Sequence, residues 1–222
     1  MNQKHGTKSI LVIGMGRFGR YLAKKMEELG NSVMVVDSRE GLEADLSSLF
    51  NDYLIGGCTN KNVLKGLGVG NFDICFVTIG ENFEASIVIT SLLKSLGAKH
   101  IVTKASRDIQ ATVLRKVGAD EIVYPEKEMA EKLAVRYNMR HVFDYIELTG
   151  DYAIFEIAAS PTWVGKTVGN LNIRQKYKVN ILAVKSTDEV HPAPGADYVF
   201  RPEDVIFVIG REKDVAYLTS LG

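Results

Sequence analysis

The chain has 222 residues, of which 46% are hydrophobic and 24% are charged, an ordinary balance for a soluble globular protein with a full core. Basic and acidic residues number 27 each, so the formal net charge is zero. This balance argues against a protein that binds nucleic acid by neutralising phosphates, and against one held to a membrane by a polybasic segment.

Apolar strands alternate with amphipathic helices from Ser9 to about Asn138. Most of the strands are near-continuous apolar runs, as in parallel strands that are covered on both faces. Several helices end at glycine, which accepts left-handed backbone geometry. The alternation predicts an α/β fold, a Rossmann-type doubly wound parallel sheet. The expected strands are Ile10–Gly14, Ser32–Asp37, Tyr53–Cys58, Ile74–Gly80, His100–Ala105 and Glu121–Tyr124, and the expected helices are Arg17–Leu29, Leu42–Phe50, Lys61–Leu67, Phe83–Leu96, Ile109–Val117 and Lys127–Tyr137.

A second pattern begins after Asn138, so we divide the chain into an N-terminal domain, residues 1–140, and a small α+β C-terminal domain, residues 141–222. Gly150 and Asp151 form a turn between strands that we expect to be antiparallel, and a polar loop with prolines precedes the last strand. The expected C-terminal elements are strands Tyr145–Leu148, Tyr152–Ala159, Asn180–Lys185 and Asp204–Gly210, helices Val168–Lys176 and Lys213–Leu221, and the loop Ser186–Asp197.

The most informative segment is the glycine motif Gly14-Met-Gly16-Arg-Phe-Gly19, which follows the first strand and opens the first helix. In such a unit the first glycine permits the tight turn, the second lets the backbone approach a diphosphate, and the third lets the helix pack closely on the sheet. Free N–H groups at the helix start hold the anion. Asp37 ends the second strand, where a carboxylate accepts hydrogen bonds from ribose hydroxyls and disfavours a 2′-phosphate. The motif predicts a nucleotide-binding site; the alternative is a glycine turn without a ligand.

Arg17 stands inside the glycine loop, where a guanidinium is placed to contact an additional phosphate, from this chain or from a symmetry-related one. The alternative is a solvated arginine at the start of a helix. The motif does not have the Gly-Lys-Ser/Thr ending of a P-loop. We therefore expect the nucleotide to be bound and not hydrolysed.

Further candidate residues follow the other strands, because open α/β sheets place their ligand crevice at the carboxyl ends of the strands. Lys104 is placed to reach a phosphate, with a solvated lysine as the equal alternative. Glu126 is a candidate ion ligand, although a first-turn helix carboxylate is the commoner case. The remaining candidates are Phe18, Ser38, Cys58, Thr59, Thr78, Ile79 and Gly80.

Patterns typical of catalysis do not stand out in the sequence. The histidines lie far apart, and Cys58 and Cys75 form neither a metal-binding spacing nor a disulfide framework. The C-terminal domain is small for the substrate domain of a dehydrogenase. No apolar run reaches the length needed to span a bilayer, so we expect a cytoplasmic protein without membrane insertion.

Taken together, several motifs resemble the cytosolic regulatory subunits of Ktr/Trk potassium-uptake systems, which are built from domains that regulate K⁺ conductance (RCK domains). These motifs are Ile13-Gly14-Met-Gly-Arg17-Phe-Gly19, Val77-Thr-Ile-Gly80-Glu-Asn-Phe-Glu-Ala85-Ser, and Val117-Gly-Ala-Asp120 through Tyr124-Pro-Glu126-Lys. The similarity continues in the C-terminal domain through Leu171-Asn-Ile-Arg174 and Asn180-Ile-Leu-Ala-Val-Lys185.

The resemblance implies a homo-octameric ring that docks under a separate membrane potassium channel. It also implies that ATP and ADP compete for the N-terminal site, with NAD(H) bound in some members. Arg17 matches an arginine that meets the terminal phosphate across a dimer, and Glu126 matches a glutamate that holds a divalent or monovalent cation between subunits. Arg174 and Asn180 align with a cyclic di-AMP site at a dimer interface. The matched nucleotide positions are Gly14, Gly16, Gly19 and Asp37.

On this resemblance, the first hypothesis is a non-enzymatic regulator that associates with the membrane through a transporter partner and gates a potassium channel by nucleotide exchange. The alternative is an NAD-dependent oxidoreductase with a compact substrate domain. A difference in ATP and ADP contacts is essential to the first hypothesis, because a ligand that binds two states equally shifts neither.

Overall fold

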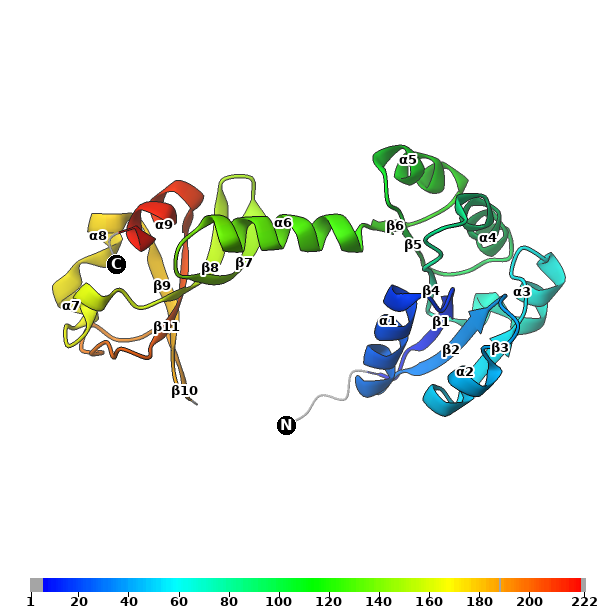
Figure 1. Cartoon of the computed structure of the whole chain (residues 1–222), viewed down its shortest axis with the longest axis horizontal. Coiled ribbons are helices and arrows are strands. Elements are labelled where there is room, and N and C mark those ends of the chain that lie inside the picture. The colour runs from blue at the N-terminus through cyan, green and yellow to red at the C-terminus, as the bar shows by residue number, and fades with distance from the viewer. Residues whose placement is uncertain (1–5, 188, 221–222) are drawn as a thin grey trace. The chain divides into compact units, whose positions relative to one another are not determined.

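The apolar runs of the N-terminal half form a six-stranded parallel sheet with the strand order β3-β2-β1-β4-β5-β6 (Figure 1). The computed structural model describes residues 6–187 and 189–220, and this sheet belongs to a unit that ends at Lys127. Ile10, Leu11 and Val12 of the central strand β1 are fully buried, because helices cover both faces of the sheet. The predicted doubly wound parallel sheet is confirmed.

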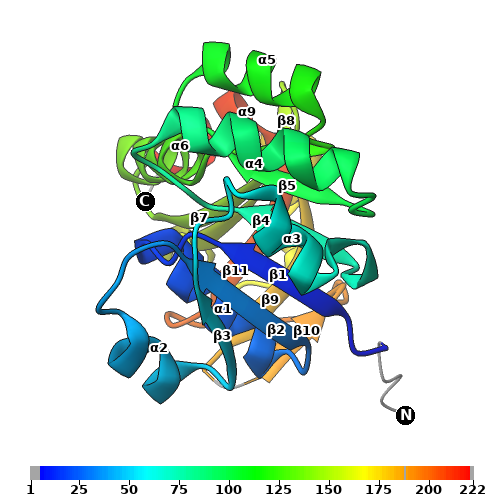
Figure 2. The same ribbon diagram turned by 90° about the vertical axis from the view of Figure 1, so that its right-hand side faces the viewer.

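Helices lie on both faces of this sheet (Figures 1 and 2). Ala23 of α1 and Leu46 of α2 pack with one set of strand side chains, and Leu64 of α3 and Leu93 of α4 pack with the alternate set. The strands are β1 (Ser9–Ile13), β2 (Ser32–Asp37), β3 (Asp52–Ile55), β4 (Ile74–Val77), β5 (Ile101–Lys104) and β6 (Glu121–Val123). The helices are α1 (Arg17–Glu28), α2 (Glu43–Leu49), α3 (Lys61–Leu67), the short 3₁₀ helix η1 (Val69–Asn71), α4 (Phe83–Ser95) and α5 (Asp108–Val117).

The order of the strands reverses between β1 and β4. From β1 the chain proceeds to β2 on one side, and from β4 it proceeds to β5 on the other. The loops that leave β1 and β4 therefore diverge at the carboxyl edge of the sheet, which is where open α/β sheets bind ligands. The glycine loop follows β1 at this point.

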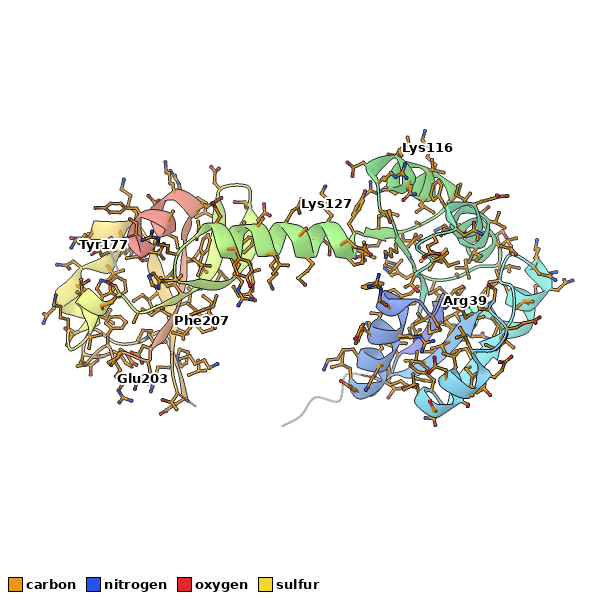
Figure 3. The ribbon with its side chains drawn as sticks, viewed as in Figure 1. Arg39, Lys116, Lys127, Tyr177, Glu203 and Phe207 are labelled. Atoms are coloured by element: carbon orange, nitrogen blue, oxygen red, sulfur yellow. The ribbon has the colours of Figure 1, made fainter. Side chains whose placement is uncertain are left out.

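An antiparallel five-stranded sheet, ordered β10-β9-β11-β8-β7, forms the second unit, which starts at Glu128. Trp163 and Phe200 are each 1% exposed, and the ring centroid of Trp163 lies 5.3 Å from that of Phe200 and 5.8 Å from that of Tyr177, which Figure 3 labels. The predicted small α+β domain is confirmed. Its elements are α6 (Pro125–Asn138), β7 (Val142–Thr149), β8 (Tyr152–Ala158), η2 (Pro161–Trp163), α7 (Val168–Leu171), α8 (Ile173–Tyr177), β9 (Asn180–Ser186), β10 (Glu189–Pro192), β11 (Val205–Arg211) and α9 (Glu212–Thr219).

Two expected C-terminal elements are wrong. The single helix Val168–Lys176 is two helices, because Asn172 has a left-handed φ of +46° and ends the first of them. The expected loop Ser186–Asp197 contains the edge strand β10, which pairs with β9. The strand was missed because the sequence of this segment is polar. Pro192 is tolerated because it is the last residue of the strand. Residue 188 of that loop, and Leu221 at the expected end of the last helix, lie outside the described residues.

The division between the two units falls after Lys127, inside α6, whereas the sequence pattern changes near residue 140. The reason is local packing. Val135 and Met139 belong to the apolar core of the second unit, and Lys132 forms an ion pair with Asp144 of β7 at 2.9 Å. The greater part of α6 is therefore packed with the C-terminal unit.

Candidate functional site

Two glycines of the glycine loop, Gly14 and Gly19, leave no room for a side chain, whereas the third, Gly16, faces open space. Gly14 has a φ of +103°, and a Cβ on Gly14 would lie 3.0 Å from Cγ1 of Ile79. A Cβ on Gly19 would lie 2.1 Å from the carbonyl oxygen of Gly14. Gly16 is exposed, and a Cβ there would meet no described atom within 4 Å. This pattern is typical of a loop that packs tightly on its sheet and offers its backbone to a ligand.

Thr78, directly after β4, anchors the loop across the point where the strand order reverses. Its hydroxyl donates to the carbonyl oxygen of Gly14 at 2.6 Å and lies 3.1 Å from that of Ile13. The residue is 5% exposed. Thr78 and Ile79, both predicted site residues, therefore support the loop from behind.

Asp37, at the end of β2, is 6% exposed and carries the densest set of hydrogen bonds at the site. Its carboxylate accepts the backbone N–H of Met15 at 2.7 Å and the guanidinium of Arg39 through Nε at 2.9 Å and Nη2 at 2.8 Å. Desolvation opposes ionisation of Asp37, but the hydrogen bonds from Arg39 and Met15 outweigh it and hold the pKa of this carboxyl below its usual value. Asp37 is thus a charged group at neutral pH and a second anchor for the glycine loop.

The first turn of α1 presents backbone N–H groups that the helix itself leaves free. Gly16 is the N-cap residue of α1. Within the described residues, this helix start has no side-chain capping hydrogen bond and no acidic residue in its first turn. The first N–H to bond inside the helix is that of Arg20, to the carbonyl oxygen of Gly16 at 3.0 Å. The earlier N–H groups, with the positive end of the helix dipole, suit an anion. Arg17 is the first helical residue, and its side chain is exposed.

Lys104 and Glu126 form an ion pair near the start of α1. The side chain of Lys104 is 10% exposed, and its Nζ lies 5.9 Å from the ring centroid of Phe18. The hydrogen bond from Lys104, aided by the field of Arg17, holds the pKa of Glu126 below its usual value. Gly80 is close to the same lysine, since a Cβ on it would lie 3.7 Å from Nζ. These predicted residues are therefore brought together.

A metal centre is not preassembled in the part of the chain that the structure describes. Within it, no group of three or more histidine, cysteine, aspartate or glutamate residues is placed to hold an ion. Glu126 instead accepts a hydrogen bond from Lys104.

Cys58 and Thr59, both predicted site residues, lie in the loop between β3 and α3. Cys58 is 3% exposed, and desolvation by burial, with the field of Asp37, raises the pKa of its thiol to about 12. The thiol is therefore protonated and unreactive at neutral pH. Thr59 and Ser38 are exposed at the ends of the loops that follow β3 and β2.

Arg174 and Asn180 belong to the C-terminal unit and form no part of the glycine-loop site. Arg174 lies on α8, Asn180 is the first residue of β9, and both are exposed. A cavity of about 560 Å³ in the same unit has Arg140, Arg211 and Lys213 in its wall; among the described residues that line it, neither Arg174 nor Asn180 appears.

Arg39 is the site residue that the sequence reasoning missed. Its guanidinium joins Asp37 to the glycine loop, because Nη2 also donates to the carbonyl oxygen of Met15 at 3.0 Å. The signal for it was the short spacing Asp37-Ser-Arg39 at the end of β2, where a basic residue lies within reach of any group bound to the aspartate.

The arrangement suits an anionic ligand with a sugar hydroxyl group. The backbone of the glycine loop and the start of α1 offer N–H donors, and the exposed Arg17 adds positive charge. One strand away, Asp37 is an acceptor for a ribose hydroxyl that exchanges places with the guanidinium of Arg39. Donors for a diphosphate beside an acceptor for a ribose are the combination that a nucleotide requires.

Comparison with protein families gives two matches that together span most of the chain. The TrkA-N domain matches residues 10–125, and the TrkA-C domain matches residues 152–221. The chain is 41% identical over 209 residues to the Ktr system potassium uptake protein C of Bacillus subtilis, covering 94% of this chain and 95% of that protein. It is 36% identical over 215 residues to the Ktr system potassium uptake protein A of the same organism, covering 97% of each.

A solved structure with a similar fold is the GsuK channel bound to NAD. It has a TM-score of 0.67 and 20% sequence identity, over 99% of this chain and 40% of that one. The chain thus spans less than half the length of the channel, and the likeness concerns the fold. Among the described residues of this chain, no helix combines the length and the apolar character that crossing a membrane requires.

Proposed function

Because the chain belongs to the family of TrkA-N and TrkA-C domain proteins that includes the Ktr potassium uptake proteins, we propose that it is a nucleotide-binding regulatory subunit of a potassium uptake system. It binds ATP and ADP in competition at the glycine loop, and NAD(H) is a further candidate ligand, since a structure of similar fold is a channel bound to NAD. In this proposal the protein is not an enzyme.

The observation that carries the proposal is the joint geometry of the glycine loop and Asp37. The backbone is open for a phosphate at Gly16, while Thr78 and the Asp37 carboxylate fix the loop on either side. Such a preformed cradle binds a diphosphate without first ordering a flexible segment, which reduces the entropic cost of binding.

The proposal extends to assembly and partner. We propose a homo-oligomer, an octameric ring, that docks on a membrane-embedded potassium channel subunit and is held at the cytoplasmic side of the membrane by that contact. Arg174 and Asn180 are proposed to bind cyclic di-AMP, and Glu126 to hold a cation between subunits. Native mass spectrometry with and without ATP tests the ring: a mass of 24.5 kDa at micromolar concentration, that of the single chain, is incompatible with it.

Arg17→Ala should lower the affinity for ATP more than the affinity for ADP, because only ATP offers a γ-phosphate to this guanidinium. The side chain is exposed in the single chain, and an exposed ion pair changes a binding constant by less than about fivefold. A desolvated pair is worth far more. We expect the ATP affinity to fall about tenfold or more relative to ADP, which requires that a second subunit enclose the contact. Isothermal titration calorimetry with both nucleotides measures this.

Arg17→Lys serves as the graded control, since an ammonium keeps the charge but cannot form the bidentate fork of a guanidinium. It should recover part of the difference between ATP and ADP. Equal losses for the two nucleotides would place Arg17 on the shared phosphates and leave Lys104 as the residue that distinguishes them.

A further inference from the structure

Arg39 occupies the acceptor positions at which Asp37 would meet a ribose. One carboxylate oxygen of Asp37 accepts the backbone N–H of Arg39 at 2.9 Å and its Nε at 2.9 Å. The other accepts the backbone N–H of Met15 at 2.7 Å and Nη2 of Arg39 at 2.8 Å. A carboxylate offers about four acceptor positions. All of them are therefore in use, and a ribose hydroxyl has to displace the guanidinium or share an oxygen with it.

The pair also changes the charge at this end of the site. An aspartate alone at the end of β2 repels a 2′-phosphate, whereas an arginine in this region accommodates one. Here the guanidinium compensates the carboxylate directly, so the Asp37–Arg39 pair carries no net charge. The repulsion that would exclude a 2′-phosphorylated ribose is removed.

The guanidinium still has donors to offer. Its hydrogen bonds use Nε and Nη2, and within residues 6–187 and 189–220 Nη1 makes no hydrogen bond. The side chain of Arg39 is 57% exposed, in contrast to the 6% of Asp37, and Figure 3 labels it on the N-terminal unit. Arg39 is therefore accessible from solvent at the carboxyl edge of the sheet, one strand from the glycine loop, and its free edge suits a phosphate.

We propose that Arg39 is a specificity-determining residue that lets the site accept an adenine nucleotide with a phosphate on the ribose 2′-oxygen. Asp37 holds the guanidinium in place through Nε and Nη2, and Nη1 binds the 2′-phosphate. For a nucleotide with a free 2′-hydroxyl, the same arginine is a competitor for the carboxylate. This inference rests on the proposed nucleotide site and revises the expectation, drawn from Asp37 alone, that a 2′-phosphate is disfavoured.

The experiment measures the dissociation constants of NAD⁺ and NADP⁺ for the full chain and for its Arg39→Ala variant by calorimetry. The two ligands differ only in the 2′-phosphate. In the variant the ratio of the NADP⁺ constant to the NAD⁺ constant should rise about tenfold or more, because the phosphate loses a partner and faces an uncompensated carboxylate. The NAD⁺ constant should stay the same or fall, since the competitor for Asp37 is gone.

Arg115→Ala is the matched control, because Arg115 is also an exposed arginine of the N-terminal unit but lies at the end of α5; it should leave the ratio unchanged. Thermal unfolding of each variant verifies that it is folded. A ratio unchanged in Arg39→Ala, or a parent chain that binds NAD⁺ or ADP but not NADP⁺, overturns the role of Arg39 and leaves the nucleotide site standing. A parent chain that binds neither of these ligands nor ADP overturns the proposed function, and this inference with it.

Discussion

Gly19→Ala should destabilise the N-terminal unit and abolish nucleotide binding. The new Cβ would lie 2.1 Å from the carbonyl oxygen of Gly14 and 2.6 Å from Oγ1 of Thr78, and these atoms are joined by a hydrogen bond. Neither belongs to the end of a flexible side chain, so α1 or the loop must move. Overpacking of this kind costs about 1–3 kcal/mol of unfolding free energy, and the displaced loop no longer presents its N–H groups to a phosphate. Urea unfolding and an ADP titration measure the two effects.

Gly16→Ala separates the two effects. Gly16 has a φ of −72°, which alanine adopts freely, and its Cβ would meet no described atom within 4 Å. The unfolding free energy should therefore change by less than about 0.5 kcal/mol. Nucleotide affinity should nevertheless fall, because the methyl group occupies the space through which the diphosphate approaches. Unimpaired ADP binding by the Gly16→Ala variant would mean that phosphates do not contact this loop.

Phe200→Ala should cost the C-terminal unit about 3–5 kcal/mol of unfolding free energy, the usual cost of removing a buried phenyl ring. Phe200 is 1% exposed, and its ring lies 5.3 Å from Trp163 and 5.7 Å from Tyr198. Trp163 is the only tryptophan of the chain, so its fluorescence reports on this core alone. The emission of the variant should shift to the red at a lower urea concentration than that of the parent chain.

Phe143→Ala is the control for this experiment, since Phe143 lies on β7 of the same unit and is 43% exposed. Its removal should change the unfolding free energy by less than about 1 kcal/mol. If the two variants unfold at the same urea concentration, the cluster around Trp163 does not stabilise the unit as its burial indicates.

The N-terminal fold could be predicted because its signals are local and agree with one another. Strand β2 and helix α3 have the bounds expected from the sequence, since apolar runs and glycine end signals mark them directly. The elements of the C-terminal unit were harder to predict. The break at Asn172 depends on a left-handed residue that tertiary packing selects, and β10 is a short polar edge strand whose only support is its pairing with β9.

The candidate site, too, was predicted in part: the residues of the motif were found, and the contacts between distant side chains were not. Motif spacing identified Gly14, Gly19 and Asp37, whose positions follow from the strand–loop–helix unit itself. The pairing of Asp37 with Arg39 was missed: the spacing of the two residues brings a basic group within reach of the carboxylate, but the side-chain conformation that forms the pair is set by the folded loop. The ion pair of Lys104 with Glu126 joins the end of β5 to the first turn of α6 and likewise appears only in three dimensions.

The hydrogen bond between Thr78 and Gly14 has a consequence for the order in which parts of the protein fold during synthesis. The two residues are 64 positions apart in the chain, and β1 pairs both with the early strand β2 and with the later strand β4. A chain emerging from the ribosome can therefore join β1 to β2 while the glycine loop is still without its support from β4. The phosphate cradle is complete only after residue 78 has been synthesised, so a bound nucleotide stabilises the finished sheet and cannot template its first half.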